Sequence, residues 1–173
     1  TVVSNTGVLA LTSAMPDSVP AGTPATITLT GVNNTGGPIS GAYVSIIFPK
    51  GLGSAGAPTS SVPGAVCGTE NVRLARTYAS CFFGDLAPGA TVSAQFTLVP
   101  NGSGDVSVDS GMFARLPSLV GIANDYVGPQ VIVVTPGPTD VQLGGWRLQR
   151  EDRGGRERTE GRFHRARAGL AGQ

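Results

Sequence analysis

Apolar and polar side chains alternate with a period of two along several segments of the chain, the pattern of β-strands that bury one face. The clearest example is residues 90–100, whose apolar face comprises Val92, Ala94, Phe96 and Leu98. Similar patterns cover residues 8–15, 25–30, 42–48, 80–83, 104–109 and 130–134. The alternation slips at Gly31, because the next apolar residue is Val32, and this predicts a β-bulge.

Turn signals rich in Gly and Pro separate these segments, and the chain outside the tail has no long helical pattern. Residues 87–89 (Ala-Pro-Gly) are typical, since Pro fixes φ and Gly permits positive φ. Residues 69–80 have weak periodicity and are interpreted as a loop with one turn. Many short strands joined by such turns predict an all-β, antiparallel β-sandwich.

Composition and charge divide the chain into two parts. It has 26 Gly and 13 Pro in 173 residues but only 13% charged residues, too few for the surface of a helical bundle. Residues 1–136 have four basic and six acidic side chains, net −2, whereas residues 137–173 have eight arginines and five acidic side chains, net +3. We expect one domain over residues 1–136. We expect a Pro/Gly linker and a disordered Arg/Gly-rich tail, or a truncated or frame-shifted next repeat, over residues 137–173.

The two cysteines indicate the compartment. If Cys67 and Cys81 pair, they close a loop of about 15 residues, and in a β-chain rich in Gly, Pro, Thr and Ser we favour a disulfide over two free thiols. This predicts an oxidising compartment. The longest apolar runs, such as residues 131–134, are far too short to span a bilayer, so no membrane span is expected. The sequence opens without a Met-initiated leader, as expected for a processed or excised piece of a longer chain.

Candidate catalytic chemistry is sparse. The only histidine, His164, lies in the tail, so residues 1–136 cannot form a Ser-His-Asp site, and the chain is predicted not to be an enzyme. Four oxygen ligands near predicted strand ends form a weak calcium candidate: Asp105, Asp109, Asn124 and Asp125. Solvated acids and an Asx turn explain them more simply, and no cofactor is expected. Acidic residues interrupt the Arg-rich tail, so no nucleic-acid binding is expected.

The order of several short motifs resembles the DUF11-type repeat of bacterial and archaeal surface proteins. In chain order they are Val19-Pro20-Ala21-Gly22, Asn34-Thr35-Gly36, Phe48-Pro49-Lys50-Gly51-Leu52, Cys67, Cys81 and Gly84-Asp85-Leu86-Ala87-Pro88-Gly89 before strand 90–100. The resemblance covers roughly residues 8–135. It implies an immunoglobulin-like sandwich of about seven strands with an internal cysteine pair, repeated in exported proteins and without assigned enzymatic residues.

These observations predict a noncatalytic structural or spacer module of an exported bacterial surface protein, located outside the cell. Its partners would be neighbouring repeats of the same polypeptide and an envelope or extracellular ligand. One alternative is an adhesive module that binds carbohydrate or protein through the variable loop 53–79, with Arg73, Arg76 and Tyr78 as contacts. Another is an accessory domain of a secreted enzyme.

Overall fold

Twelve strands form from the residues that the computed structural model describes, which are 1–5, 7–49, 52–54, 56–72, 76–116 and 122–137. In chain order they are β1 (Val2–Asn5), β2 (Leu9–Ala14), β3 (Ser18–Pro20), β4 (Ala25–Asn33), β5 (Ile39–Pro49), β6 (Leu52–Ser54), β7 (Thr59–Ser60), β8 (Val66–Val72), β9 (Arg76–Leu86), β10 (Thr91–Pro100), β11 (Gly104–Arg115) and β12 (Ile122–Thr135). Apart from Gly137, the tail predicted to be disordered lies outside the described residues.

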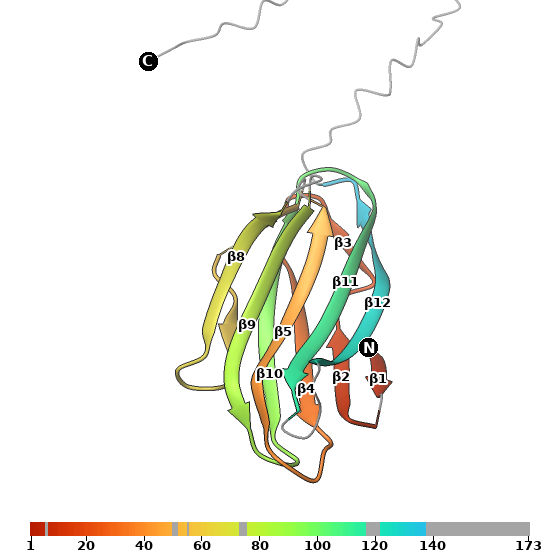
Figure 1. The fold of residues 1–173 in the computed structure, drawn as a ribbon. Coiled ribbons are helices and arrows are strands. Elements are labelled where there is room, and N and C mark those ends of the chain that lie inside the picture. Colours follow the sequence, from red (N-terminus) through yellow and green to blue (C-terminus); the bar gives the residue numbers. More distant parts are fainter. Residues whose placement is uncertain (6, 50–51, 55, 73–75, 117–121, 138–173) are drawn as a thin grey trace, which may run out of the picture. The chain divides into compact units, whose positions relative to one another are not determined.

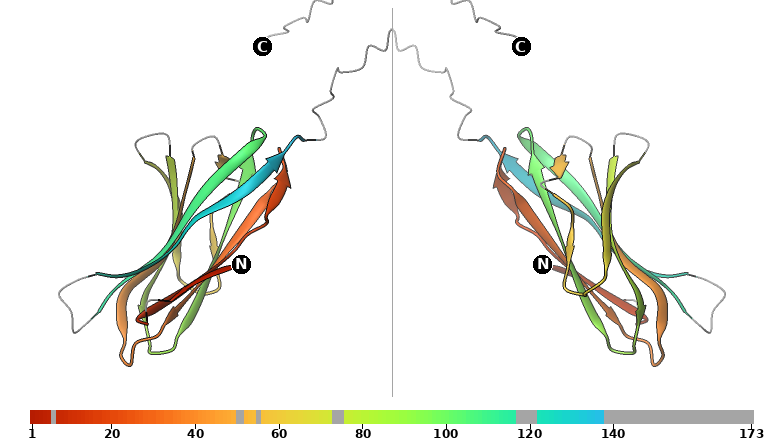
Figure 2. Two further views of the ribbon diagram at one scale, coloured as in Figure 1. Left: turned by 90° about the vertical axis from the view of Figure 1, so that its right-hand side faces the viewer. Right: turned by 90° about the vertical axis from the view of Figure 1, so that its left-hand side faces the viewer.

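The strands are arranged in two sheets that face each other, as Figures 1 and 2 show. Sheet A has the order β1-β2-β4-β10-β6, with β7 also paired to β10, and sheet B has the order β3-β12-β11-β5-β9-β8. The all-β sandwich is therefore confirmed. The described residues contain more strands than the seven or so expected, because short segments such as β3, β6 and β7 have too few residues to show an alternation. No helix long and apolar enough to cross a bilayer occurs among the described residues.

The core lies between the two sheets and is built from their inward-facing apolar side chains. In β10 the four apolar residues of the alternating pattern, Val92, Ala94, Phe96 and Leu98, are all buried, as predicted. Leu9 and Leu11 of β2 and Ile27 and Leu29 of β4 belong to the same apolar layer of sheet A. Sheet B contributes residues such as Val44, Ile46 and Phe48 of β5. Burying apolar surface in this way supplies the main driving force for folding.

The β-bulge predicted at Gly31 is wrong. Strand β4 keeps an unbroken register with β10 through Gly31, which pairs with Val92. Gly31 faces the core, and a Cβ at this position would lie 2.5 Å from the Sδ of Met112 on β11 in the other sheet. The apolar side chain missing from the pattern is thus supplied by Met112, a residue distant in the sequence.

The loop predicted for residues 69–80 is also wrong, because these residues lie mainly in strands β8 and β9, which form an antiparallel pair. The inward-facing residues of β9 in this region, Thr77 and Ala79, are buried but small or polar. They give little contrast with the outward-facing Tyr78 and Ser80. A pattern of hydrophobicity therefore does not detect the first part of β9, whereas the strand predicted over residues 80–83 is confirmed as its second part.

Asn33, at the end of β4, connects two turns that are distant in the sequence. Its buried side-chain nitrogen lies within hydrogen-bond distance of the carbonyl oxygens of Gly37 (3.0 Å), Leu86 (3.1 Å) and Ala87 (2.9 Å). Its side-chain oxygen accepts hydrogen bonds from the backbone N–H and hydroxyl of Thr35. The β4–β5 turn is thereby joined to the β9–β10 turn at one end of the sandwich.

Replacing Asn33 with Ala should lower the free energy of unfolding by about 3 kcal/mol, because the carbonyls of Leu86 and Ala87 lose their buried donor. Chemical denaturation of the two proteins measures this difference. The exposed Asn101, in the β10–β11 turn, provides the control, since Asn101→Ala should change stability by less than about 0.5 kcal/mol. Equal effects at the two positions would contradict the role assigned to Asn33.

Candidate functional site

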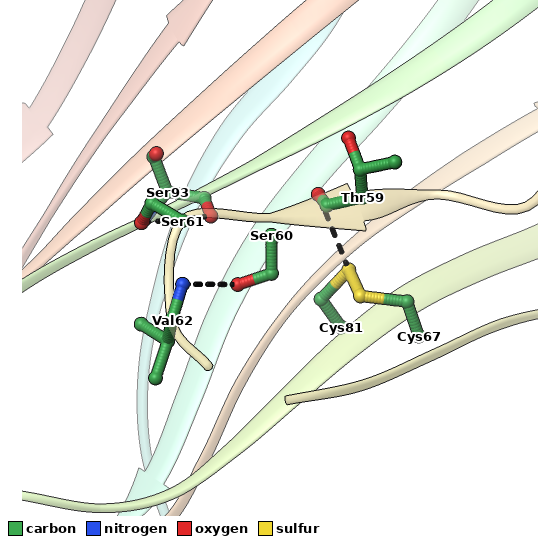
Figure 3. Close-up of a disulfide and its surroundings, with 7 residues drawn as sticks. All are labelled: Thr59, Ser60, Ser61, Val62, Cys67, Cys81 and Ser93. Carbon is green, nitrogen blue, oxygen red and sulfur yellow. Dashed lines mark hydrogen bonds between the residues drawn. A yellow bond between two sulfur atoms is a disulfide. The ribbon is translucent and has the colours of Figure 1, made fainter. Parts of the chain in front are cut away.

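Cys67 and Cys81 form a disulfide, which confirms the pairing predicted from the sequence (Figure 3). They are directly opposite each other on β8 and β9, with a Cα–Cα distance of 4.0 Å. Cys81 is fully buried, and its Sγ lies 3.8 Å from the carbonyl oxygen of Thr59 on β7. The bridge therefore holds β8, the edge strand of sheet B, against the sheet at a point where β7 of sheet A also makes contact.

The contact loop predicted for residues 53–79 is only partly a loop in the described part of the chain, since residues 56–58 and 61–65 lie outside the strands but the segment also contains most of β6, all of β7 and β8, and the start of β9. Arg73 lies outside the described residues. Arg76 forms an ion pair with Asp109 of β11, with 3.5 Å between guanidinium nitrogen and carboxylate oxygen. Tyr78 is a hydrogen-bonding neighbour of Tyr43 of β5, and burial and this neighbour raise the pKa of Tyr43. Arg76 and Tyr78 thus make contacts within sheet B rather than projecting from a loop.

The four calcium candidates are not brought together. Asp105 is opposite Val133, whereas Asp125 is opposite Met112, seven residues further along β11, which places the two about 23 Å apart. Asp125 is only 1% exposed, and its carboxylate accepts hydrogen bonds from the backbone N–H groups of Leu11 (3.2 Å) and Tyr126 (3.1 Å). Among the described residues, no group of three or more His, Cys, Asp or Glu side chains is placed to hold a metal ion. Asp125 instead links β12 of sheet B to β2 of sheet A.

Four aromatic residues form a cluster on the outer face of sheet B, termed here the outer aromatic cluster: Tyr43, Tyr78, Phe113 and Tyr126. Tyr43 and Phe113 are cross-strand partners, and their rings are stacked with centroids 4.8 Å apart. Phe113 meets Tyr126 edge to face at 5.2 Å. These are the two geometries that aromatic pairs favour.

Gly111 makes room for the cluster. A Cβ at this position would lie 2.7 Å from the Phe113 ring and 3.2 Å from the Tyr126 ring. The two rings therefore lie over the Gly111 backbone and cover it, and Gly111 is buried although it belongs to the outer face. A side chain at position 111 would push the rings apart.

The Tyr43 hydroxyl lies close to two other tyrosine side chains of the cluster. Burial raises the pKa of Tyr43 above its ordinary value of 10.0, and the neighbouring Tyr78 and Tyr126 raise it further. The hydrogen bond with Tyr78 acts in the same direction, because Tyr43 donates it and must keep its proton to do so. Tyr43 is therefore a fixed, neutral donor on this face of the sheet.

Beside the cluster is a hollow of about 620 Å³. It is lined chiefly by Ser40, Gly41 and Tyr43 of β5, Phe82 of β9, Arg115 of β11 and Ile122 of β12. The strand register shifts twice between Ile39 and Tyr43, and again between Phe113 and Arg115. Such bulges bend strands and redirect side chains, and here two neighbouring strands carry them at the same level of sheet B.

The pattern of residues along the chain does not predict the outer aromatic cluster or the hollow. Phe113, Tyr126 and Arg115 lie in segments where no strand was predicted, and Tyr43 was placed on a strand without a functional role. Only 6% of the residues are aromatic, and those of the cluster are scattered between positions 43 and 126. Only the strand register of sheet B brings them together, and the sequence pattern does not show that register.

Comparison with known proteins gives structural similarity only. No protein-family model matches the chain, and no curated protein matches it. Among solved structures, the cohesin module from a Clostridium perfringens family 33 glycoside hydrolase matches with a TM-score of 0.53 and 10% identity, over 79% of this chain and 99% of that one. A protein from Corynebacterium diphtheriae described as membrane anchored matches with a TM-score of 0.50 and 14% identity, over 75% of this chain and 36% of that one. At such identities the similarity supports the fold alone.

Removing the disulfide should destabilise the domain. The double variant Cys67→Ala/Cys81→Ala should lose about 3 kcal/mol of unfolding free energy, because the cross-link no longer restricts a loop of about 15 residues in the unfolded chain. Denaturation of both proteins measures the loss. Thiol titration of the unfolded wild type without reductant is the companion measurement, and finding two reactive thiols would rule out the bridge.

The raised pKa of Tyr43 predicts a dependence of stability on alkaline pH. The folded state holds the Tyr43 proton more tightly than the unfolded state does. The associated stabilisation is therefore complete below pH 10.0 and is lost as the pH rises through the raised pKa. Tyr43→Phe has no such proton, so its unfolding free energy should fall less steeply above pH 10.0. Denaturation curves at a series of alkaline pH values measure the two slopes, and identical slopes would exclude this role of Tyr43.

Proposed function

We propose that this chain is a noncatalytic structural module of an exported bacterial surface protein, a DUF11-type repeat that spaces or displays other parts of the same polypeptide outside the cell. Two of the motifs behind the DUF11 resemblance lie side by side at one end of the sandwich, which supports the proposal. Asn33 directly precedes the Asn34-Thr35-Gly36 motif and bonds to Leu86 and Ala87 of the Gly-Asp-Leu-Ala-Pro-Gly motif.

Three further features support a noncatalytic module of an exported protein. The Cys67–Cys81 disulfide is of the kind that persists in oxidising compartments. The buried carboxylate of Asp125 is occupied by backbone N–H groups, which is a structural use of an acidic side chain. The fold is also of a type that serves as a module in a larger protein, as in the cohesin module of the glycoside hydrolase.

The role of a spacer rests on the pairing of β3 with β12, the parallel pair in sheet B. Ser18, Val19 and Pro20 are opposite Val133, Val134 and Thr135. Two backbone hydrogen bonds flank the pair, from Val133 N–H to the Asp17 carbonyl and from Ala21 N–H to the Thr135 carbonyl, each 2.9 Å long. Figure 1 shows β3 and β12 beside each other, with β12 ending at the top of the sandwich.

This arrangement resists tension between the two sides of the chain. Because β3 and β12 are parallel, a force that passes beyond β1 and β2 of sheet A to reach β3, and that pulls on the chain after β12, draws the two strands in opposite directions along their common axis. The hydrogen bonds between them are then loaded together instead of opening one at a time. A module that spaces other domains on a cell surface needs this resistance.

Only one of the two alternative functions loses support. Adhesion through residues 53–79 loses support, because Arg76 and Tyr78 are engaged by Asp109 and Tyr43. An accessory domain of a secreted enzyme would use the same β3–β12 pair to keep its distance from the catalytic domain. A catalytic domain encoded in the same gene would distinguish the accessory domain from the surface repeat.

Substituting Val133 with Pro tests the spacer role, because it removes the N–H that donates to Asp17. Single-molecule pulling of tandem copies should show a clearly lower unfolding force, and equilibrium stability should fall by about 1–3 kcal/mol.

Val131→Pro is the matched control. Val131 is 51% exposed and Val133 is 46% exposed, and both N–H groups point to the same side of β12, but Val131 lies beyond the register of β3. The control should keep the wild-type unfolding force. If both variants unfold at the wild-type force, β3–β12 does not carry the tension and the spacer proposal fails.

A further inference from the structure

We infer that the hollow on the outer face of sheet B is a binding site for a uronic acid residue of an acidic polysaccharide. This site lies outside the β3–β12 pair and does not depend on the spacer role. The inference rests on the shape of the hollow, on its exposed apolar side chains and on one arginine side chain.

The hollow offers an apolar surface that is exposed to solvent. Phe82 is 47% exposed and Ile122 is 66% exposed, although both are large apolar side chains. Phe82 is the cross-strand partner of Tyr43, and its ring edge lies 3.9 Å from the position of a Cβ on Gly41. The Phe82 ring therefore leans over the glycine backbone. Exposed apolar surface beside a hollow is typical of a binding site.

The apolar surface is held in place by its neighbours. Tyr43 is stacked on Phe113 and donates a hydrogen bond to Tyr78, so that its ring has a fixed position at the rim of the hollow. Gly41 has a φ of +61°, a left-handed conformation that glycine adopts without strain, and it allows the backbone of β5 to turn beneath Phe82. A site of this kind is largely formed before its ligand arrives, which reduces the entropic cost of binding.

Arg115 gives the hollow its charge preference. Of the two arginines that the structure describes, Arg76 is paired with Asp109, whereas the Arg115 side chain has no ion-pair or hydrogen-bond partner among the described residues. Among the residues that the structure describes, no carboxylate lines the hollow. The guanidinium group is planar and matches a carboxylate with two parallel hydrogen bonds.

Together these groups select a ligand with a flat apolar side, hydroxyl groups and a carboxylate. A pyranose ring presents C–H groups that pack against an aromatic ring such as Phe82, and its hydroxyls can bond to Ser40. A uronic acid adds the carboxylate that complements Arg115. The volume of about 620 Å³ is in the range of small-ligand sites and suits one or two sugar units of a longer chain.

Calorimetric titration of the whole chain with oligosaccharides of galacturonate, glucuronate and mannuronate tests the inference, with each compared against its methyl ester. The ester keeps the ring and the hydroxyls but removes the charge. At least one acid series should bind, and its ester should bind about tenfold more weakly.

Arg115→Gln should cause a similar loss of about tenfold in affinity for the acid, and Phe82→Ala should weaken the acid and the ester alike. Arg76→Gln is the matched control, because it removes an arginine from the same face of sheet B that is already paired, and it should bind as the wild type does. Thermal unfolding of each variant shows that it is folded.

Several results would overturn the inference. These are no binding of any of the three acids, equal binding of acid and ester, or an equal loss in Arg76→Gln and Arg115→Gln. Binding of peptides through their C-terminal carboxylate, with the same dependence on Arg115 and no binding of uronates, would assign the hollow to a peptide instead. None of these results bears on the unfolding force of the Val133→Pro variant, so failure here is distinct from failure of the spacer proposal.

Discussion

The burial of two apolar sheet faces against each other is the constraint on which the rest of the structure depends. Every inward-facing position must be filled. The two sheets fit so closely that a side chain of one sheet fills a position left empty in the other. At Gly31 the missing side chain is replaced by Met112 from the facing sheet. Interiors packed to this density leave little room for a binding site between the sheets. Functional variation is therefore confined to the outer faces, the edges and the turns.

The buried polar groups serve the same packing. Asn33 satisfies carbonyls from two turns, and Asp125 accepts hydrogen bonds from Leu11 and from its own neighbour Tyr126. A buried amide or carboxylate is stable only when such partners are present. Both side chains therefore connect segments that are distant in the sequence, and this role as connectors accounts for their burial without invoking catalysis.

The two proposed roles use different parts of sheet B. The pairing of β3 with β12 involves Val133–Thr135, whereas the hollow includes Ile122 at the other end of the same strand. These positions are about 36 Å apart along β12. Tension carried by the β3–β12 pair would therefore not interfere with binding of a ligand in the hollow. A module on a cell surface could maintain spacing through one end and contact an acidic polymer through the other.

The sequence by itself determined the all-β class, the inward-facing residues of strands such as β10, and the disulfide, because each of these depends on local alternation or on a single pair of cysteines. The tertiary structure decided the rest. The first part of strand β9 gives no alternating pattern because its inward residues Thr77 and Ala79 are small, and Gly31 continues its strand because Met112 fills the gap. The outer aromatic cluster and the hollow exist only through the register of neighbouring strands and the bulges that shift it. Register is a relation between segments far apart in the chain, so no local pattern of residues contains it.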